Sequence, residues 1–297
     1  MHSKRRTLFG WSMAVVMMIL LLSVSVHVWA QIDSETATKG KRNFYLVGMG
    51  PGDPDLATIR AMKIVEEADL IICHKSLNEN FFRVLKKKKA MYIPVDGWIW
   101  FGYGKKAADF QGKQLEKFQS SEKMRGQVIT KIREAIRKGK RVAVLASGDP
   151  LIYGPWSWTL EEFQDLDPVV VPGISCFNAA HAALKKDVTW SDTVKSTILT
   201  ADDWPGTKDT IGNLASHQVT MVVFTMGLEL KDLIEKLSTN YPPHTPIAII
   251  CHAGYKEKEH VIKGTIGTII DKTQNQKLPF EHLVYVGENL NFKWKNN

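Results

Sequence analysis

The chain has 297 residues, of which 44% are hydrophobic and 24% charged, and its formal net charge is +8 at pH 7. This composition is that of a globular protein long enough for two α/β domains, and it excludes a disordered or fibrous chain. The positive charge is mild and spread over many lysines, so it predicts no nucleic-acid partner. The lysine run at 86–89 is typical of a solvated helix end.

The first 30 residues have the pattern of a targeting segment. Basic residues at positions 4–6 precede an uncharged apolar run from Leu8 to about Val26, and Ala30 follows. This order is typical of a signal peptide, and the run is also long enough for a retained membrane anchor. Both interpretations place the rest of the chain outside the cytoplasm, because positive charge stays on the cytoplasmic side. If the segment is not used for export, the protein is expected in the cytoplasm.

Residues 31–42 are polar and lack apolar periodicity, which predicts a linker. From Asn43, short apolar β-rich runs alternate with helical stretches, and this predicts a parallel sheet in an N-terminal α/β domain, residues 43–190. The ligand crevice of such a sheet lies at the carboxyl ends of its strands. Strands are expected at 44–47, 70–73, 91–95, 142–145 and 169–171, and helices at 57–67, 78–87, 122–138 and 157–164.

Residues 191–297 predict a second α/β domain. The charged strand at 257–263 favours a mixed sheet with antiparallel members over a repeat of the first domain. Strands are expected near 196–200, 220–225, 246–251, 259–263 and 283–286, and helices near 229–238 and 265–272.

Two Gly-rich acidic turns follow predicted strands. The first, residues 48–54, is no dinucleotide loop, because Pro51 removes a backbone donor and Asp53 adds negative charge where a phosphate would bind. The second contains Gly148, Asp149 and Pro150. A crevice shared by such turns suits a neutral or cationic ligand with ribose hydroxyls, and it suits a pyrophosphate poorly. The alternatives are a purely structural first turn and an N-cap role for Asp149.

These turns and several later segments together resemble the tetrapyrrole (corrin and porphyrin) methylases. Residues 241–253 are similar to the precorrin-4 branch and residues 145–150 to the precorrin-6 branch, so the resemblance is closest to the precorrin methyltransferases of cobalamin biosynthesis without selecting one branch. The matching segments are 47–54, 148–154, 171–175, 220–227, 245–249, 261–265 and 286–287.

The resemblance implies that S-adenosylmethionine binds in a cleft between the two α/β domains and that its methyl group is transferred to a tetrapyrrole, a corrin or porphyrin precursor. By analogy it also implies a homodimer. The implied alternatives are a helix cap for Ser175 and ordinary core positions for Ile152 and Met226. The cofactor contacts carried over by motif are Pro51, Ser147, Gly148, Asp149, Ile152, Ser175, Cys176, Met226 and Ala253.

His74 is the candidate catalytic residue. It takes the place of an acidic residue that is thought to act as a base in porphyrinogen-type members of the family, and a histidine can accept a proton near neutral pH. The alternative is an ordinary polar residue at a strand end.

All three cysteines fall where the family fold has its cleft, and two are followed by histidines: Cys73-His74, Cys176 and Cys251-His252. Convergence of these groups would suit a soft metal ion or haem iron, whereas the alternative is buried apolar cysteine, and no metal ligand is assigned. Because S-adenosylmethionine is made in the cytosol, a second hypothesis is an exported tetrapyrrole- or metal-binding module without methyltransferase activity.

Aromatic residues gather in two loops at the same edge. A planar macrocycle could stack on them, and the alternative is local packing. The first loop carries Trp98, Trp100, Phe101 and Tyr103, and the second carries Tyr153, Trp156 and Trp158.

Overall fold

The computed structural model describes residues 42–85, 91–95 and 98–293, and a compact unit begins at Asn43. The expected signal peptide or anchor, nearly all of the linker and the lysine run lie outside the described residues. Within the described residues, no helix is long and apolar enough to cross a membrane.

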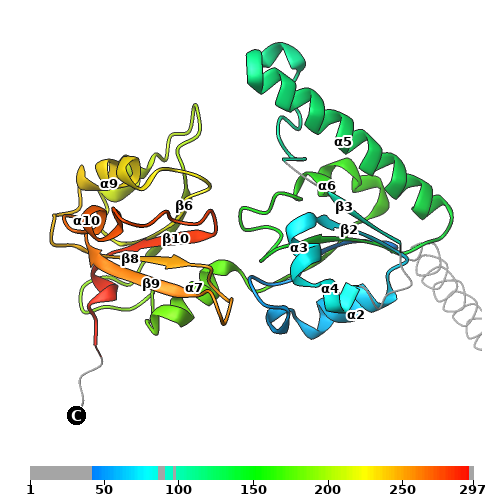
Figure 1. Cartoon of the computed structure of the whole chain (residues 1–297). Helices are drawn as coiled ribbons and strands as arrows, with labels where there is room; N and C mark the ends of the chain where they lie inside the picture. Colours follow the sequence, from blue (N-terminus) through cyan, green and yellow to red (C-terminus); the bar gives the residue numbers. More distant parts are fainter. Residues whose placement is uncertain (1–41, 86–90, 96–97, 294–297) are drawn as a thin grey trace, which may run out of the picture. The chain divides into compact units, whose positions relative to one another are not determined.

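The first sheet has five parallel strands in the order β3-β2-β4-β1-β5. Helices α2, α3 and α4 cover one face, and α5 and α6 cover the other (Figure 1). Both faces are therefore buried, which explains why the central strands are almost wholly apolar. The elements are β1 (Phe44–Gly48), α2 (Ile59–Glu67), β2 (Leu70–His74), α3 (Lys75–Asn80), α4 (Phe82–Leu85), β3 (Met91–Val95), α5 (Gly112–Arg137), β4 (Val142–Ala146), α6 (Trp158–Glu162) and β5 (Val169–Val171).

The second sheet is mixed, in the order β6-β7-β10-β8-β9, as the charged strand predicted. β6 and β7 are parallel, β10 is antiparallel to β7 and β8, and β9 is antiparallel to β8. One face packs against α8, α9 and α10. The elements are β6 (Thr197–Ala201), α8 (Ile211–Ala215), β7 (Thr220–Phe224), α9 (Leu230–Ser238), β8 (Pro246–Cys251), β9 (His260–Thr265), α10 (Ile269–Thr273) and β10 (His282–Val286).

Helix α7 (Cys176–Leu184) follows β5 of the first sheet but packs on the open face of the second sheet (Figure 1). Its buried residues Ala180 and Leu184 share a core cluster with strands β7, β8 and β10. The Tyr285 hydroxyl of β10 donates to the carbonyl of Phe177 at 2.9 Å. The turn between β5 and α7 therefore connects the two sheets.

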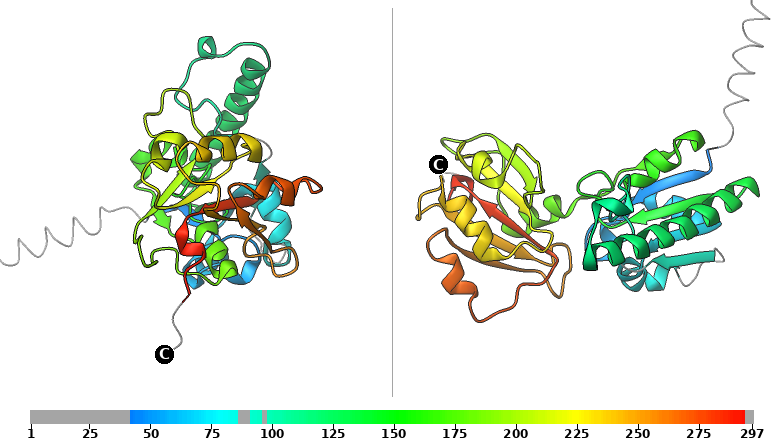
Figure 2. Two further views of the ribbon diagram at one scale, coloured as in Figure 1. Left: turned by 90° about the vertical axis from the view of Figure 1, so that its left-hand side faces the viewer. Right: turned by 90° about the horizontal axis from the view of Figure 1, so that it is seen from above.

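Three helical regions differ from expectation. α5 begins at Gly112, whereas the sequence predicted a start near residue 122. The earlier start was missed because the first turns of the helix are mostly exposed and show little apolar periodicity. Figure 2 shows this long green helix beside the first sheet. The expected helix at 78–87 is instead the pair α3 and α4, and α8 was not expected. The strands lie within one or two residues of their predicted ranges.

Candidate active site

Three turns meet at the carboxyl edge of the first sheet. Gly50 and Gly148 form an isolated bridge, in which the Gly148 N–H donates to the Gly50 carbonyl at 2.9 Å. A Cβ added to Gly48 would lie 2.5 Å from the backbone nitrogen of Gly173. The absence of side chains at these glycines therefore allows the turns after β1, β4 and β5 to touch.

Asp149 braces two of these turns. Its carboxylate accepts hydrogen bonds from the N–H groups of Leu151 at 2.9 Å and Gly173 at 3.2 Å. The predicted alternative, an N-cap for the next helix, is wrong, because α6 begins at Trp158 and has Ser157 at its N-cap position. The carboxylate instead orders the turn backbone.

Gly148 is buried beside the start of α7. Its φ is +71°, and an added Cβ would lie 3.9 Å from Cys176 N and from Ile174 O, which is ordinary contact distance. Ser175 does cap α7, since its hydroxyl accepts from the Phe177 N–H at 3.2 Å. Of the remaining turn residues in the predicted set, Pro51 is buried and Ser147 is exposed.

Four other predicted contacts form a second group. Ile152, Cys176, Met226 and Ala253 come from separate segments, yet all are partly buried against the same core cluster under α7. Met226 has φ +51°, a left-handed conformation that costs energy for a residue with a side chain. The alternative of ordinary core positions does not describe Ile152 and Met226 fully, because both keep part of their surface exposed.

The turn after β1 also contacts the loop after β8. The Asp53 N–H donates to the Gly254 carbonyl and the Asp53 carboxylate accepts from the Lys256 N–H, both at 3.0 Å. Lys256 forms an ion pair with Asp55. A Cβ on Gly52 would overlap the backbone of Gly254. These contacts bring Pro51 and Ala253, two predicted cofactor contacts, into neighbouring stretches of backbone.

His74 ends β2 and is the N-cap residue of α3. Its Nδ1 accepts the Ser76 N–H at 3.3 Å and lies 2.8 Å from the Ser76 hydroxyl. The backbone bond favours the neutral tautomer with the proton on Nε2. For His74 to take a second proton, Nδ1 must therefore release the Ser76 N–H.

The three cysteines do not converge on one site, and the alternative of buried apolar cysteine describes their positions. Cys73 lies in the core beneath α2 and α3, Cys251 in the core beneath α9 and α10, and Cys176 in the cluster under α7. All are free thiols, and burial raises the pKa of Cys73 to about 12 and those of Cys176 and Cys251 to about 11. Among the described residues, no group of three or more His, Cys, Asp or Glu could hold a metal ion.

The aromatic residues of the two predicted loops differ in burial. Trp156 and Trp158 are buried in the core of the first sheet, which is local packing, and Tyr153 packs on the Phe224 ring with centroids 4.7 Å apart. Trp98 is instead 39% exposed. Its ring contacts that of Phe280, a residue that carries no motif and that sequence reasoning missed.

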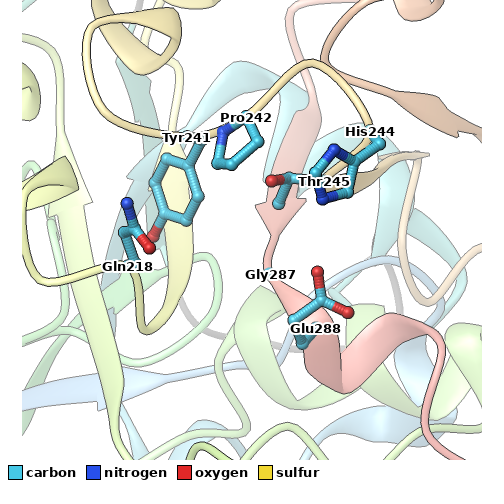
Figure 3. A pocket seen from close by; sticks show the side chains of 7 residues that line it. All are labelled: Gln218, Tyr241, Pro242, His244, Thr245, Gly287 and Glu288. Atoms are coloured by element: carbon cyan, nitrogen blue, oxygen red, sulfur yellow. The ribbon is translucent and has the colours of Figure 1, made fainter.

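A pocket of about 170 Å³ lies elsewhere (Figure 3). Its lining includes Thr245 just before β8 and Gly287 just after β10, which is the edge opposite Met226 and Ala253 because β10 is antiparallel to β7 and β8. It is therefore separate from the predicted cofactor contacts. The full lining is Gln218, Tyr241, Pro242, His244, Thr245, Gly287 and Glu288.

The fold is that of an α/β protein whose motif turns meet at the carboxyl ends of the strands of the first sheet, and these turns lack the features of a dinucleotide loop. Residues 43–270 match the family of tetrapyrrole (corrin/porphyrin) methylases. The chain therefore belongs to this family, whose members are methyltransferases that use S-adenosylmethionine. The predicted family, fold, enzyme class and cofactor are thereby confirmed.

Relatives in sequence span nearly the whole chain. A cobalt-precorrin-4 C(11)-methyltransferase from Methanocaldococcus jannaschii is 30% identical over 260 residues, covering 85% of this chain and 90% of that protein. A uroporphyrinogen-III C-methyltransferase from Cyanidium caldarium is 29% identical over 262 residues, with coverages of 85% and 95%.

Solved structures share the fold. A cobalt-precorrin-4 methyltransferase of cobalamin biosynthesis superimposes with a TM-score of 0.66 at 22% identity, covering 83% of this chain and 95% of that one. A uroporphyrin-III C-methyltransferase from Thermus thermophilus, complexed with S-adenosylhomocysteine, gives a TM-score of 0.59 at 19% identity, with coverages of 84% and 99%.

Proposed function

We propose that this chain transfers the methyl group of S-adenosylmethionine to a carbon atom of a tetrapyrrole precursor of the corrin or porphyrin type. The observation that supports this most directly is the assembly of the predicted contacts into two groups. One group consists of the turns braced by Asp149, and the other packs on the cluster under α7. Relatives named for precorrin-4 and for uroporphyrinogen III support the substrate class, and we leave the choice between them to experiment.

The residues present fit this cofactor. Gly148 lies beside the start of α7, where a Cβ would be 3.9 Å from the Cys176 nitrogen, and the absence of a side chain would let a ligand approach this backbone closely. Ile152, Met226 and Ala253 offer apolar surface for an adenine ring, and the nine predicted contacts include no Lys or Arg that would favour a pyrophosphate. Backbone groups around Ser147 and Cys176 would hold the polar parts of the nucleoside.

S-adenosylmethionine supplies an electrophilic methyl group on a sulfonium. Transfer forms a carbon–carbon bond to the macrocycle and breaks the sulfur–methyl bond, so the protein contributes chiefly alignment of the two partners. We propose that His74, at the carboxyl edge of β2, assists by receiving at Nδ1 the proton that the methylated macrocycle releases, once its bond to the Ser76 N–H opens.

Isothermal titration of the purified full-length chain in mild detergent tests the cofactor half of this proposal. We expect S-adenosylmethionine and S-adenosylhomocysteine to bind with similar affinity, and absence of binding to both would refute the function. Incubation with labelled S-adenosylmethionine and either uroporphyrinogen III or cobalt-precorrin-4 then identifies the substrate by the product that carries the label.

We further propose, from the sequence alone, that residues 1–30 export or anchor the domain and that the protein is a homodimer. A reporter fused after residue 42 tests the first point, because activity of a cytosol-only reporter would contradict export. Light scattering of the purified chain tests the second, since a monomer mass would contradict the dimer.

A further inference from the structure

Two exposed aromatic rings, one from a loop of each sheet, are in contact near the predicted cofactor contacts. Trp98 lies after β3, and Phe280 lies just before β10. Their ring centroids are 6.4 Å apart with an interplanar angle of 79°. Trp98 is 39% exposed and Phe280 is 63% exposed, so the pair keeps much of its apolar surface in water. An exposed aromatic pair of this kind has surface left for a further partner.

The pair adjoins the predicted cofactor contacts. A Cβ added to Gly227 would lie 3.9 Å from the Phe280 ring, and Gly227 directly follows Met226. β3 ends at the carboxyl edge of the first sheet, and β10 begins at the carboxyl ends of β7 and β8. A ligand held beside Met226 would therefore have this aromatic pair as a neighbour.

Helix α5 holds the loop of Trp98 in place. The Ser121 hydroxyl donates to the carbonyl of Trp98 at 2.9 Å. The buried Arg125 guanidinium donates to the carbonyls of Ile99 at 2.8 Å and Phe101 at 2.7 Å. Residues four apart lie on one face of a helix, so the same face repeatedly contacts this loop. The ring is thus presented from a loop that is fixed before any ligand arrives.

Lys117, one turn before Ser121 on this helix face, adds a positive charge. Its Nζ lies 4.0 Å from the ring centroid of Trp98 and 4.5 Å from that of Phe101. Burial lowers the pKa of Lys117, and in the described part of the chain no carboxylate pairs with it. An anionic ligand would supply the missing counter-charge.

We propose that Trp98 and Phe280 contact one face of the tetrapyrrole substrate and that Lys117 binds one of the carboxylate side chains of the macrocycle. This inference rests on the proposed function for its ligand class. It assigns specificity to residues outside the family's motifs. The two rings contact the apolar pyrrole surface, and the Lys117 ammonium selects a macrocycle with carboxylates at its periphery.

Titration of the full-length chain with uroporphyrin, followed by visible absorbance, tests the role of the rings. Trp98→Ala and Phe280→Ala are each expected to weaken binding about tenfold, the loss typical of one aromatic contact together with its buried area. Trp190→Ala is the matched control, because Trp190 is 52% exposed and precedes β6, at the other end of the second sheet. Unchanged affinity in both ring variants would overturn the inference.

The charge is tested with two probes of opposite sign. Lys117→Gln should weaken uroporphyrin binding roughly threefold to tenfold and should not weaken binding of the cationic tetrakis(N-methylpyridinium)porphyrin. Lys123→Gln, an exposed lysine of the same helix, should change neither. Equal losses for both probes, or no loss for uroporphyrin, would reject the carboxylate contact.

Binding of S-adenosylhomocysteine to each variant separates this inference from the proposed function. Unchanged affinity for S-adenosylhomocysteine shows that a variant is folded, and thermal unfolding provides the same check if the wild type does not bind it. A wild type that binds S-adenosylhomocysteine but no uroporphyrin would overturn this inference alone. If Trp98→Ala folds poorly, the result for Phe280→Ala decides whether the rings bind uroporphyrin. The Phe280 ring is mostly exposed, so its removal should leave the fold intact.

Discussion

The carboxylate of Asp149 accepts a hydrogen bond from the backbone N–H of Gly173 at 3.2 Å, and it thereby joins the turn after β4 to the turn after β5. Its other oxygen accepts from the Leu151 N–H. The acidic side chain that made the Gly-Asp-Pro motif look like part of a ligand site thus orders the backbone that would form that site.

Asp149→Asn should destabilise the protein by about 1–2 kcal/mol, because an amide can accept only one of the two bonds and turns its NH₂ toward the other donor. Asp192→Asn, at an exposed position, serves as control. Urea denaturation measures the difference. Equal midpoints for the two variants would mean that the Asp149 carboxylate does not brace the turns.

If the cofactor contacts the backbone of this turn, Gly148→Ala should reduce the affinity for S-adenosylhomocysteine more than tenfold, since its Cβ would lie between that backbone and the ligand. Gly206→Ala is matched to it, because Gly206 has φ +86° and open surroundings, so it carries the same backbone strain away from the site. Both variants should lose about 1 kcal/mol of stability. A Gly148→Ala variant that binds as well as Gly206→Ala would exclude cofactor contact at this turn.

Gly52→Ala should be far more destabilising than Gly104→Ala. Both residues have positive φ, +70° and +74°, but a Cβ at Gly52 would overlap the backbone of Gly254, whereas at Gly104 nothing lies within 4 Å. The expected losses are roughly 3 kcal/mol or more and about 1 kcal/mol. Denaturation midpoints compare them, and similar losses would show that the turn after β1 and the loop after β8 do not touch.

Replacement of His74 distinguishes a catalytic role from a capping role. His74→Asn can still accept the Ser76 N–H through its side-chain oxygen but cannot take up a proton, whereas His74→Ala loses both functions. If His74 is the base, both variants lose about 100-fold or more in the methyl-transfer rate while binding S-adenosylhomocysteine normally. A His74→Asn variant with the wild-type rate would show that His74 acts only as the N-cap of α3.

The buried thiol of Cys73 should make stability fall in alkali. Burial raises its pKa in the folded protein to about 12, above the unfolded value of 9.0, so the unfolded chain loses this proton first. The stabilising contribution is complete below pH 9 and is lost as pH rises toward 12, by roughly 2–3 kcal/mol at pH 11. Cys73→Ala should show a shallower decline between pH 9 and 11 in denaturation experiments, and an equal slope would contradict this account.

Most of the fold could be predicted from the sequence, because a buried strand such as β4 is a continuous apolar run bounded by Gly and polar residues. An unbroken apolar run does not show toward which face of the sheet each side chain points. Cys73 and Cys251 were placed correctly at strand ends, but nothing in an unbroken apolar strand shows that their side chains point into separate cores.

The motif turns of the candidate site were predictable, whereas their partners were not. The partner of Asp149 depends on β1 lying between β4 and β5, an order that emerges only in the folded sheet. Phe280 and Lys117 lie in segments without a motif, and their contacts with Trp98 join residues far apart in the chain. Sequence reasoning therefore predicted the motif turns and the aromatic loop of Trp98, and it missed the contacts of Trp98 with Phe280 and Lys117.

The position of α7 limits how this chain can be divided. A chain cut after residue 190 would leave α7 with the N-terminal fragment and expose the face of the second sheet that Ala180 and Leu184 cover. A cut in the turn between β5 and α7 would keep that face covered. Split reporters, circular permutants and separately expressed halves should therefore be designed with the break before Ser175.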